Sequence, residues 1–167
     1  MSVLADFSTW LGSTRISWAM SGGYPWLWPA CETLHFMGLA LLIGAVGILD
    51  LRMIGMARGL PLASVQRLMP WAVLGFVVNL ITGVLFFVGE PQQYVKNIAF
   101  LMKMLFIVLA GVNVFLFYAT GLHKRVDEMA PGGEAPVGAR VVGAASLVLW
   151  IGVVYWGRML PFIGNAF

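Results

Sequence analysis

Charged residues are scarce in this sequence, and their scarcity excludes a soluble globular protein. Only 10% of the 167 residues are charged, whereas 60% are hydrophobic. Soluble domains carry about 25% charged residues, so the composition indicates an integral membrane protein in contact with the lipid bilayer. The net charge of +3 does not indicate a nucleic-acid-binding protein, because the basic residues lie at the ends of the apolar segments, where membrane topology accounts for them.

Cysteine is almost absent as well. Cys31 is the single cysteine, which excludes an internal disulfide bond and a thiolate-rich metal site within one subunit. The sequence also lacks the motifs of hydrolases and phosphoryl-transfer enzymes, since it contains no phosphate-binding loop and no zinc motif. The N-terminus lacks a basic start followed by an unbroken apolar core, so we expect no cleavable signal peptide.

Four long apolar segments predict four transmembrane helices. Each approaches or exceeds the ~20 residues that a spanning helix needs, and we place them at 29–55, 68–89, 97–121 and 137–160. In residues 1–22, apolar and polar side chains recur at helical spacing, which predicts an amphipathic helix on the membrane surface. The predicted fold is therefore an all-α integral membrane protein: a single four-helix transmembrane domain with an N-terminal amphipathic surface helix.

The distribution of lysine and arginine predicts the orientation. Six lie in the segments that follow the first and third spanning helices (Arg52, Arg58, Arg67, Lys124, Arg125 and Arg140), and three lie on the opposite side (Arg15, Lys96 and Arg158). Loops rich in Lys and Arg stay in the cytoplasm. We therefore expect a multi-pass protein of a bacterial inner membrane with both termini in the periplasm.

The first spanning segment carries ionisable residues inside the apolar sequence. At about 100° per residue, Glu32, His35 and Asp50 fall on one stripe of the helix. An ionisable group in hydrocarbon costs several kcal/mol unless it faces a partner or a cavity, so we expect this stripe to face the bundle interior. Lys103, in the second turn of the third spanning helix, lies near the membrane level of Glu32 and His35, because the first and third helices run in the same direction.

Two interpretations of this polar layer stay open. An ion pair between Glu32 and Lys103, beside a neutral His35, would satisfy all three groups without a cofactor. Alternatively, His35 is a metal ligand, since neutral imidazole is a common ligand of haem iron and of copper. For copper, the softer side chains of Cys31 and Met102 would be the further ligands.

The pattern also resembles a known group of proteins. Its marks are the helix-one sequence Glu32-Thr33-Leu34-His35, the glycine-rich continuation to Asp50-Leu51-Arg52, and the helix-three run from Lys103-Met104-Leu105 to Gly111-Val112-Asn113. These features resemble small bacterial four-helix membrane proteins related to the CopD copper-resistance domain and to HemJ-type protoporphyrinogen oxidases. The HemJ resemblance implies haem b as cofactor, with His35 and Lys103 as the functional pair. The CopD resemblance implies copper handling through His35, Cys31 and Met102.

We therefore expect a haem-b-binding inner-membrane redox protein, either an oxidoreductase or an electron carrier, with its cofactor in the periplasmic half of the bundle. His35 would ligate the iron, Lys103 would be the second ligand or a propionate partner, and Glu32 would orient the pair. Three further polar residues of the second and third helices are expected to border the cofactor: Asn79, Thr82 and Asn113.

Two other functions remain as alternatives. One is a CopD-like protein of copper transport or delivery that uses the same polar layer. The other is a non-catalytic partner subunit. In that case the small residues Ala40, Gly44 and Gly47 of the first spanning helix would let another membrane protein, or a second copy of this chain, approach closely.

Overall fold

The structure is a computed structural model that describes residues 3–129 and 132–163, and the described residues form helices and no strand. Four helices are long and apolar enough to span a membrane. They are α3 (Leu27–Ile54), α5 (Met69–Gly89), α7 (Ile98–Ala119) and α9 (Val137–Met159). The predicted fold class, an all-α four-helix membrane protein, is confirmed.

Local sequence signals fix where the spanning helices begin and end. Pro70 occupies the first turn of α5, where its missing N–H leaves no hydrogen bond unmade. The side chain of Asn97 accepts a hydrogen bond of 2.9 Å from the backbone N–H of Ala99 and so caps the start of α7. Gly55 ends α3 in the left-handed conformation, with φ of 91°, which glycine adopts without steric strain.

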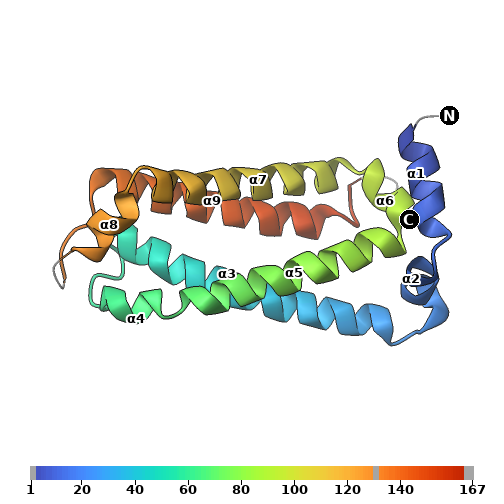
Figure 1. Cartoon of the computed structure of the whole chain (residues 1–167), viewed down its shortest axis with the longest axis horizontal. Helices are drawn as coiled ribbons and strands as arrows, with labels where there is room; N and C mark the ends of the chain where they lie inside the picture. Colours follow the sequence, from blue (N-terminus) through green and yellow to red (C-terminus); the bar gives the residue numbers. More distant parts are fainter. Residues whose placement is uncertain (1–2, 130–131, 164–167) are drawn as a thin grey trace.

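Short helices connect the spans. They are α1 (Val3–Gly12), α2 (Arg15–Trp18), a π-helical turn η1 (Ala19–Gly23), α4 (Leu62–Gln66), α6 (Pro91–Val95) and α8 (Leu122–Asp127). In Figure 1, α1, α2 and α6 lie at one end of the bundle, and α4 and α8 lie at the other. We refer to these as the α1/α6 end and the α4/α8 end.

The four spans form two antiparallel pairs. Helix α3 packs along α5, and α7 packs along α9 rather than along α5. Contacts between α3 and α9 join the two pairs. In Figure 1, α3 and α5 cross, and α3 lies farther from α9 toward the α1/α6 end. The ionisable residues near the start of α3 and α7 lie toward this α1/α6 end.

The closest approach between α3 and α5 occurs at two glycines. A Cβ atom on Gly75 would lie 2.5 Å from the carbonyl oxygen of Gly38, and a Cβ atom on Gly38 would lie 2.9 Å from the carbonyl oxygen of Gly75. Only residues without a side chain allow two helix backbones to come this near. By contrast, an added Cβ on Gly44 or Gly47 would meet nothing within 4 Å, so these two residues are not where the helices of this chain meet.

The N-terminal segment differs from the single helix expected over residues 1–22. It is divided into α1, α2 and η1, and residues 1–2 lie outside the described residues. The division occurs because Thr14 is extended and its hydroxyl accepts a hydrogen bond from the N–H of Ser17, which starts a new helix. In Figure 1, α1 runs across the end of the bundle. Its apolar side chains, such as Leu4 and Trp10, are exposed, as a helix on a membrane surface requires.

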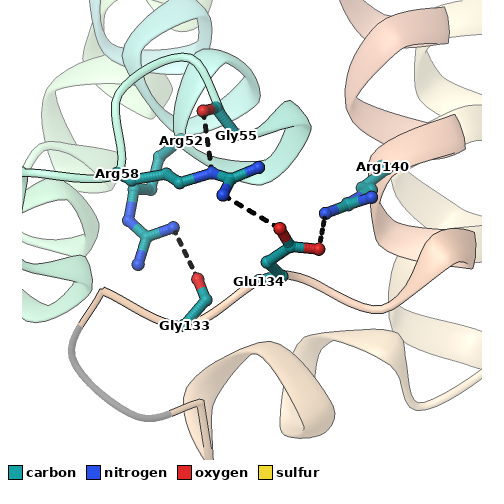
Figure 2. Close-up of polar contacts among 6 residues, drawn as sticks. All are labelled: Arg52, Gly55, Arg58, Gly133, Glu134 and Arg140. Carbon is teal, nitrogen blue, oxygen red and sulfur yellow. Dashed lines mark hydrogen bonds and ion pairs between the residues drawn. The ribbon is translucent and has the colours of Figure 1, made fainter.

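Arg52 ties the connecting segments together at the α4/α8 end, and it is almost fully buried. Its Nε donates a hydrogen bond of 3.0 Å to the carbonyl of Leu60, and its Nη1 donates one of 3.2 Å to the carbonyl of Gly133. Figure 2 shows a second contact nearby, in which Glu134 lies between Arg58 and Arg140 and pairs with both. These contacts hold the segment before α9 against the end of α3.

Candidate functional site

His35 projects from α3 toward α5, near the α1/α6 end. Its Nδ1 lies 2.7 Å from the Oγ1 of Thr82 on α5. The ring of Phe86, also on α5, packs edge-on against the imidazole with 5.5 Å between ring centroids, and Trp28 packs on Phe86 at 5.0 Å. The imidazole is half-buried. It is thus fixed by one hydrogen bond and by an aromatic contact, both from α5.

The hydrogen bonds of Thr82 assign the tautomer of His35. The Thr82 hydroxyl has a single proton, which it donates to the carbonyl of Val78 on its own helix at 2.7 Å. With that proton donated to Val78, the Thr82 oxygen accepts a hydrogen bond from His35, and the proton of the neutral ring is assigned to Nδ1. The lone pair is then on Nε2, which forms no hydrogen bond in the described part of the chain. A histidine in this state can ligate a metal through Nε2.

Lys103 approaches the same region from α7. The side chain runs past Gly157 on α9, where an added Cβ would lie 3.7 Å from Nζ. Its positive charge lies within electrostatic range of the His35 ring. Within residues 3–129 and 132–163, Lys103 forms no ion pair, because both ion pairs found there involve Glu134. The half-buried ammonium therefore has no anionic partner in this region.

Glu32 does not form the ion pair with Lys103 that the cofactor-free interpretation expected. Its side chain is exposed and accepts a hydrogen bond of 3.3 Å from the indole N–H of Trp28, one turn earlier on α3. The ion pair is missing because Glu32 turns out of the bundle while Lys103 lies against α9. Helical spacing placed both residues at a common level but did not determine the side to which each points.

Glu32 instead acts on Tyr94 in the short helix α6. Burial, together with the carboxylates of Glu90 and Glu32, raises the pKa of the Tyr94 phenol to about 12. The ring of Tyr94 also packs against two phenylalanines: its centroid lies 6.1 Å from that of Phe87 and 5.2 Å from that of Phe100. This aromatic group closes the α1/α6 end between α5 and α7.

The two asparagines expected near a cofactor serve the packing of helices. Asn79 donates a hydrogen bond of 2.9 Å to the carbonyl of Gly75 on its own helix, beside Gly38. Asn113 donates one of 3.0 Å to the carbonyl of Val142 and so joins α7 to α9. Of the three polar residues expected beside the cofactor, only Thr82 contacts His35.

The residues expected to bind copper come from two helices, α3 and α7. Cys31 is buried one turn before His35 on α3, and Met102 is half-buried beside Lys103 on α7. Within the described residues, no group of three or more His, Cys, Asp or Glu side chains could hold a metal ion. His123 lies at the α4/α8 end, against Tyr118, and is thus separated from His35 by most of the length of the bundle.

Sequence analysis missed two features of this region. One is the contact between Phe86 and His35. The position of Phe86 on the face of α5 that carries Gly75, Asn79 and Thr82 could have indicated this contact. Asp50, expected on the same stripe as His35, lies toward the α4/α8 end, beside Ser146 of α9. Helical periodicity gave the angular position of each residue on its own helix, but it did not identify the residues that each would contact.

Comparisons with known proteins give one match. A model of a family of unknown function, DUF6644, matches residues 15–163, which include all four spanning helices and the site around His35. No curated protein and no solved structure matches the chain. The protein therefore belongs to the DUF6644 family.

Proposed function

We propose that this protein is a haem-b-binding redox protein of a bacterial inner membrane, with His35 as an axial ligand of the iron. The hydrogen bond between His35 and Thr82 carries the proposal. Histidines that ligate metals almost always donate their second ring N–H to a fixed acceptor, which sets the tautomer and the ring orientation. The Thr82 hydroxyl, 2.7 Å from His35 Nδ1, would be such an acceptor.

Haem b would supply one-electron transfer between ferric and ferrous iron. The residues of this chain would hold and shield the cofactor. Thr82 would keep the lone pair of His35 on Nε2, and Phe86 would restrict the ring to one orientation. Four-helix bundles hold cofactors between facing helices, and His35 and Lys103 lie on α3 and α7, which belong to different pairs.

Lys103, which forms no ion pair among the described residues, also supports the proposal. A half-buried ammonium without an anion is unfavourable in a membrane interior. A haem propionate would supply the missing negative charge, or the amine would serve as the second iron ligand. Glu32 is exposed and bonded to Trp28, so we assign it no direct contact with the cofactor.

The proposed orientation places the His35 level in the periplasmic half of the membrane. Six lysines and arginines follow α3 and α7 at the α4/α8 end, and three lie at the opposite end (Arg15, Lys96 and Arg158). The positive-inside rule then puts the α4/α8 end in the cytoplasm and both termini in the periplasm. Cysteine accessibility labelling of single-cysteine variants in intact cells and in inverted vesicles would test this orientation.

An absorption spectrum tests the cofactor. The full chain is produced in haem-proficient cells, purified in detergent and compared with two variants, His35→Ala and His123→Ala. These replace the two histidines of the chain, which lie at opposite ends of the bundle. We expect a Soret band in the wild type and in His123→Ala, and its loss in His35→Ala.

Two results would contradict the haem proposal. One is a colourless wild-type protein, and the other is a Soret band that is the same in His35→Ala. A colourless preparation with stoichiometric copper, lost in His35→Ala, would favour the CopD-like alternative with Cys31 and Met102 as further ligands. A protein without metal or pigment would favour the partner-subunit alternative. In that case the exposed Ala40 and Gly44 would be the first positions to examine for contacts with another subunit.

A further inference from the structure

An apolar groove runs along the contact between α3 and α9. Its volume is about 420 Å³, which lies within the range of small-molecule pockets. The wall contributed by α3 consists of Ile43, Gly47 and Asp50. The wall contributed by α9 consists of Leu147, Trp150, Ile151, Val154, Tyr155, Arg158 and Met159. At ~1.5 Å per residue, the α9 wall is ~18 Å long.

The groove is separate from the region around His35. Asp50 lies 15 residues beyond His35 along α3, which is ~22 Å at ~1.5 Å per residue. His35 contacts Thr82 on α5, whereas the groove residues of α3 face α9. An inference about the groove therefore does not depend on the haem proposal.

Asp50 lies at the end of the groove nearest α4 and α8, and its carboxyl group is incompletely satisfied. The residue is 2% exposed. The side chain of Ser146 on α9 lies beside it, and among the described residues its Oδ2 atom is buried without a hydrogen-bond partner. Arg52, two residues further along α3, does not compensate this charge, because its guanidinium donates to the carbonyls of Leu60 and Gly133. A buried carboxyl oxygen without a donor is unfavourable, and a cation or a hydrogen-bond donor would relieve this.

The charges at the two ends of the groove differ in sign. Asp50 lies at one end, and the guanidinium of Arg158, which rests on the ring of Phe162, lies at the other. A cationic head group is therefore attracted to the Asp50 end and repelled from the Arg158 end. Trp150 lies one helical turn from Ser146 on α9, where an aromatic ring adds a favourable site for an ammonium group. The apolar side chains between the two ends match a hydrocarbon tail.

We propose that this groove binds a lipophilic primary amine in its protonated form, with the ammonium group at Asp50 and the hydrocarbon tail along the apolar wall of α9. The ammonium would donate the hydrogen bond that Oδ2 lacks and would neutralise the carboxylate. The tail would bury its apolar surface against Ile43, Ile151 and Val154.

Calorimetric titration of the full chain in phosphatidylcholine nanodiscs would test this, with n-octylamine as the probe and empty nanodiscs as the reference for partitioning into lipid. We expect saturable binding of octylamine and no saturable binding of octanoate or octanol. Octanol has the same tail and can donate a hydrogen bond but carries no charge. Binding of octanol as tight as that of octylamine would overturn the cation proposal.

Two pairs of variants locate the site. Asp50→Asn keeps the size of the side chain but removes its charge, and we expect it to weaken octylamine binding about tenfold or more. Asp127→Asn, which changes an exposed aspartate of α8, should bind as the wild type does. Unchanged binding in Asp50→Asn, with helix content and gel-filtration profile preserved, would overturn the proposal.

The second pair fills space without a change in charge. An added Cβ on Gly47 or on Gly44 would meet no atom within 4 Å, so a side chain can begin at either position without a clash, but only Gly47 lines the groove. We expect Gly47→Leu to abolish saturable binding and Gly44→Leu to leave it unchanged. Equal effects of the two substitutions would place the binding site elsewhere and would overturn the proposal.

Discussion

The Nδ1 atom of His35 lies 2.7 Å from the hydroxyl oxygen of Thr82, across the contact between α3 and α5. With the Thr82 proton donated to the carbonyl of Val78 at 2.7 Å, the threonine oxygen is the acceptor for His35. One backbone-anchored hydroxyl thus decides which nitrogen of the imidazole is free. In a membrane interior, where few other acceptors exist, such a contact has a larger effect on the ring than it would have in water.

Without the Thr82 hydroxyl, the neutral His35 ring should no longer be held in a single tautomer. Thr82→Val keeps the shape of the side chain but leaves Nδ1–H without its acceptor, whereas Thr82→Ser keeps an oxygen at the same place. Nitrogen NMR of ¹⁵N-histidine-labelled protein should show a single Nδ1–H form in the wild type and in Thr82→Ser, and a mixture of forms in Thr82→Val. If haem binds at His35, Thr82→Val should also lower its affinity by about 10- to 100-fold. A spectrum of Thr82→Val identical to that of the wild type would contradict the assignment.

The crossing of α3 and α5 should tolerate no side chain at Gly75. A Cβ atom there would lie 2.5 Å from the carbonyl oxygen of Gly38 and 2.8 Å from the backbone nitrogen of Leu42. Both contacts involve backbone, so the two helices must move apart. Gly75→Ala should therefore destabilise the protein by about 1–3 kcal/mol.

The matched control for this change is Gly111→Ala, because an added Cβ on Gly111 of α7 would meet nothing within 4 Å. Thermal unfolding in detergent, followed by circular dichroism, would compare the two variants. Equal midpoints for Gly75→Ala and Gly111→Ala would show that α3 and α5 do not cross at these glycines.

Arg52 should hold the segment before α9 in place. Its guanidinium bonds two carbonyls, those of Leu60 and Gly133. Arg52→Met keeps an apolar stem of similar length but removes both hydrogen bonds, so the free energy of unfolding should fall by about 2 kcal/mol or more. Limited proteolysis should then cut faster between α8 and α9. Arg67→Met, at an exposed arginine, is the control, and a cleavage rate as low in Arg52→Met as in this control would refute the anchoring role.

The ion pairs of Glu134 should weaken in acid. Arg140, with a smaller effect from Arg58, lowers the pKa of the Glu134 carboxyl. Because the folded pKa is below the unfolded value of about 4.3, the contribution to stability is complete above that value and is lost as the pH falls through the lower folded pKa. The residue is exposed, so salt should reduce the effect at every pH.

Unfolding of the wild type and of Glu134→Gln as a function of pH would measure this contribution. The wild type should be more stable at neutral pH, and the difference should vanish as the pH falls below the usual titration range of a glutamate. A difference that grows in acid would have the wrong sign for a carboxylate paired with arginines.

The sequence by itself determined the four spans and the residues that bear polar groups within them. Hydrocarbon sets the length of a spanning helix and requires its backbone to be hydrogen-bonded internally, so composition and length suffice to identify α3, α5, α7 and α9. Helical spacing also placed His35 and Lys103 near a common level. These properties depend on the chain and the solvent alone, and not on which helices become neighbours.

Only the tertiary structure decided which partner each polar side chain meets. Periodicity gives a residue an angle around its own helix but no neighbour across the bundle. His35 found Thr82 because Gly38 and Gly75 let α3 approach α5. Asp50 reached Ser146 because α9 packs on the adjacent flank of α3, and Glu32 was left outside the bundle. The pairing of the helices thus assigned the contacts of the site, because a side chain bonds to whatever the packed backbones bring within about 3 Å of it.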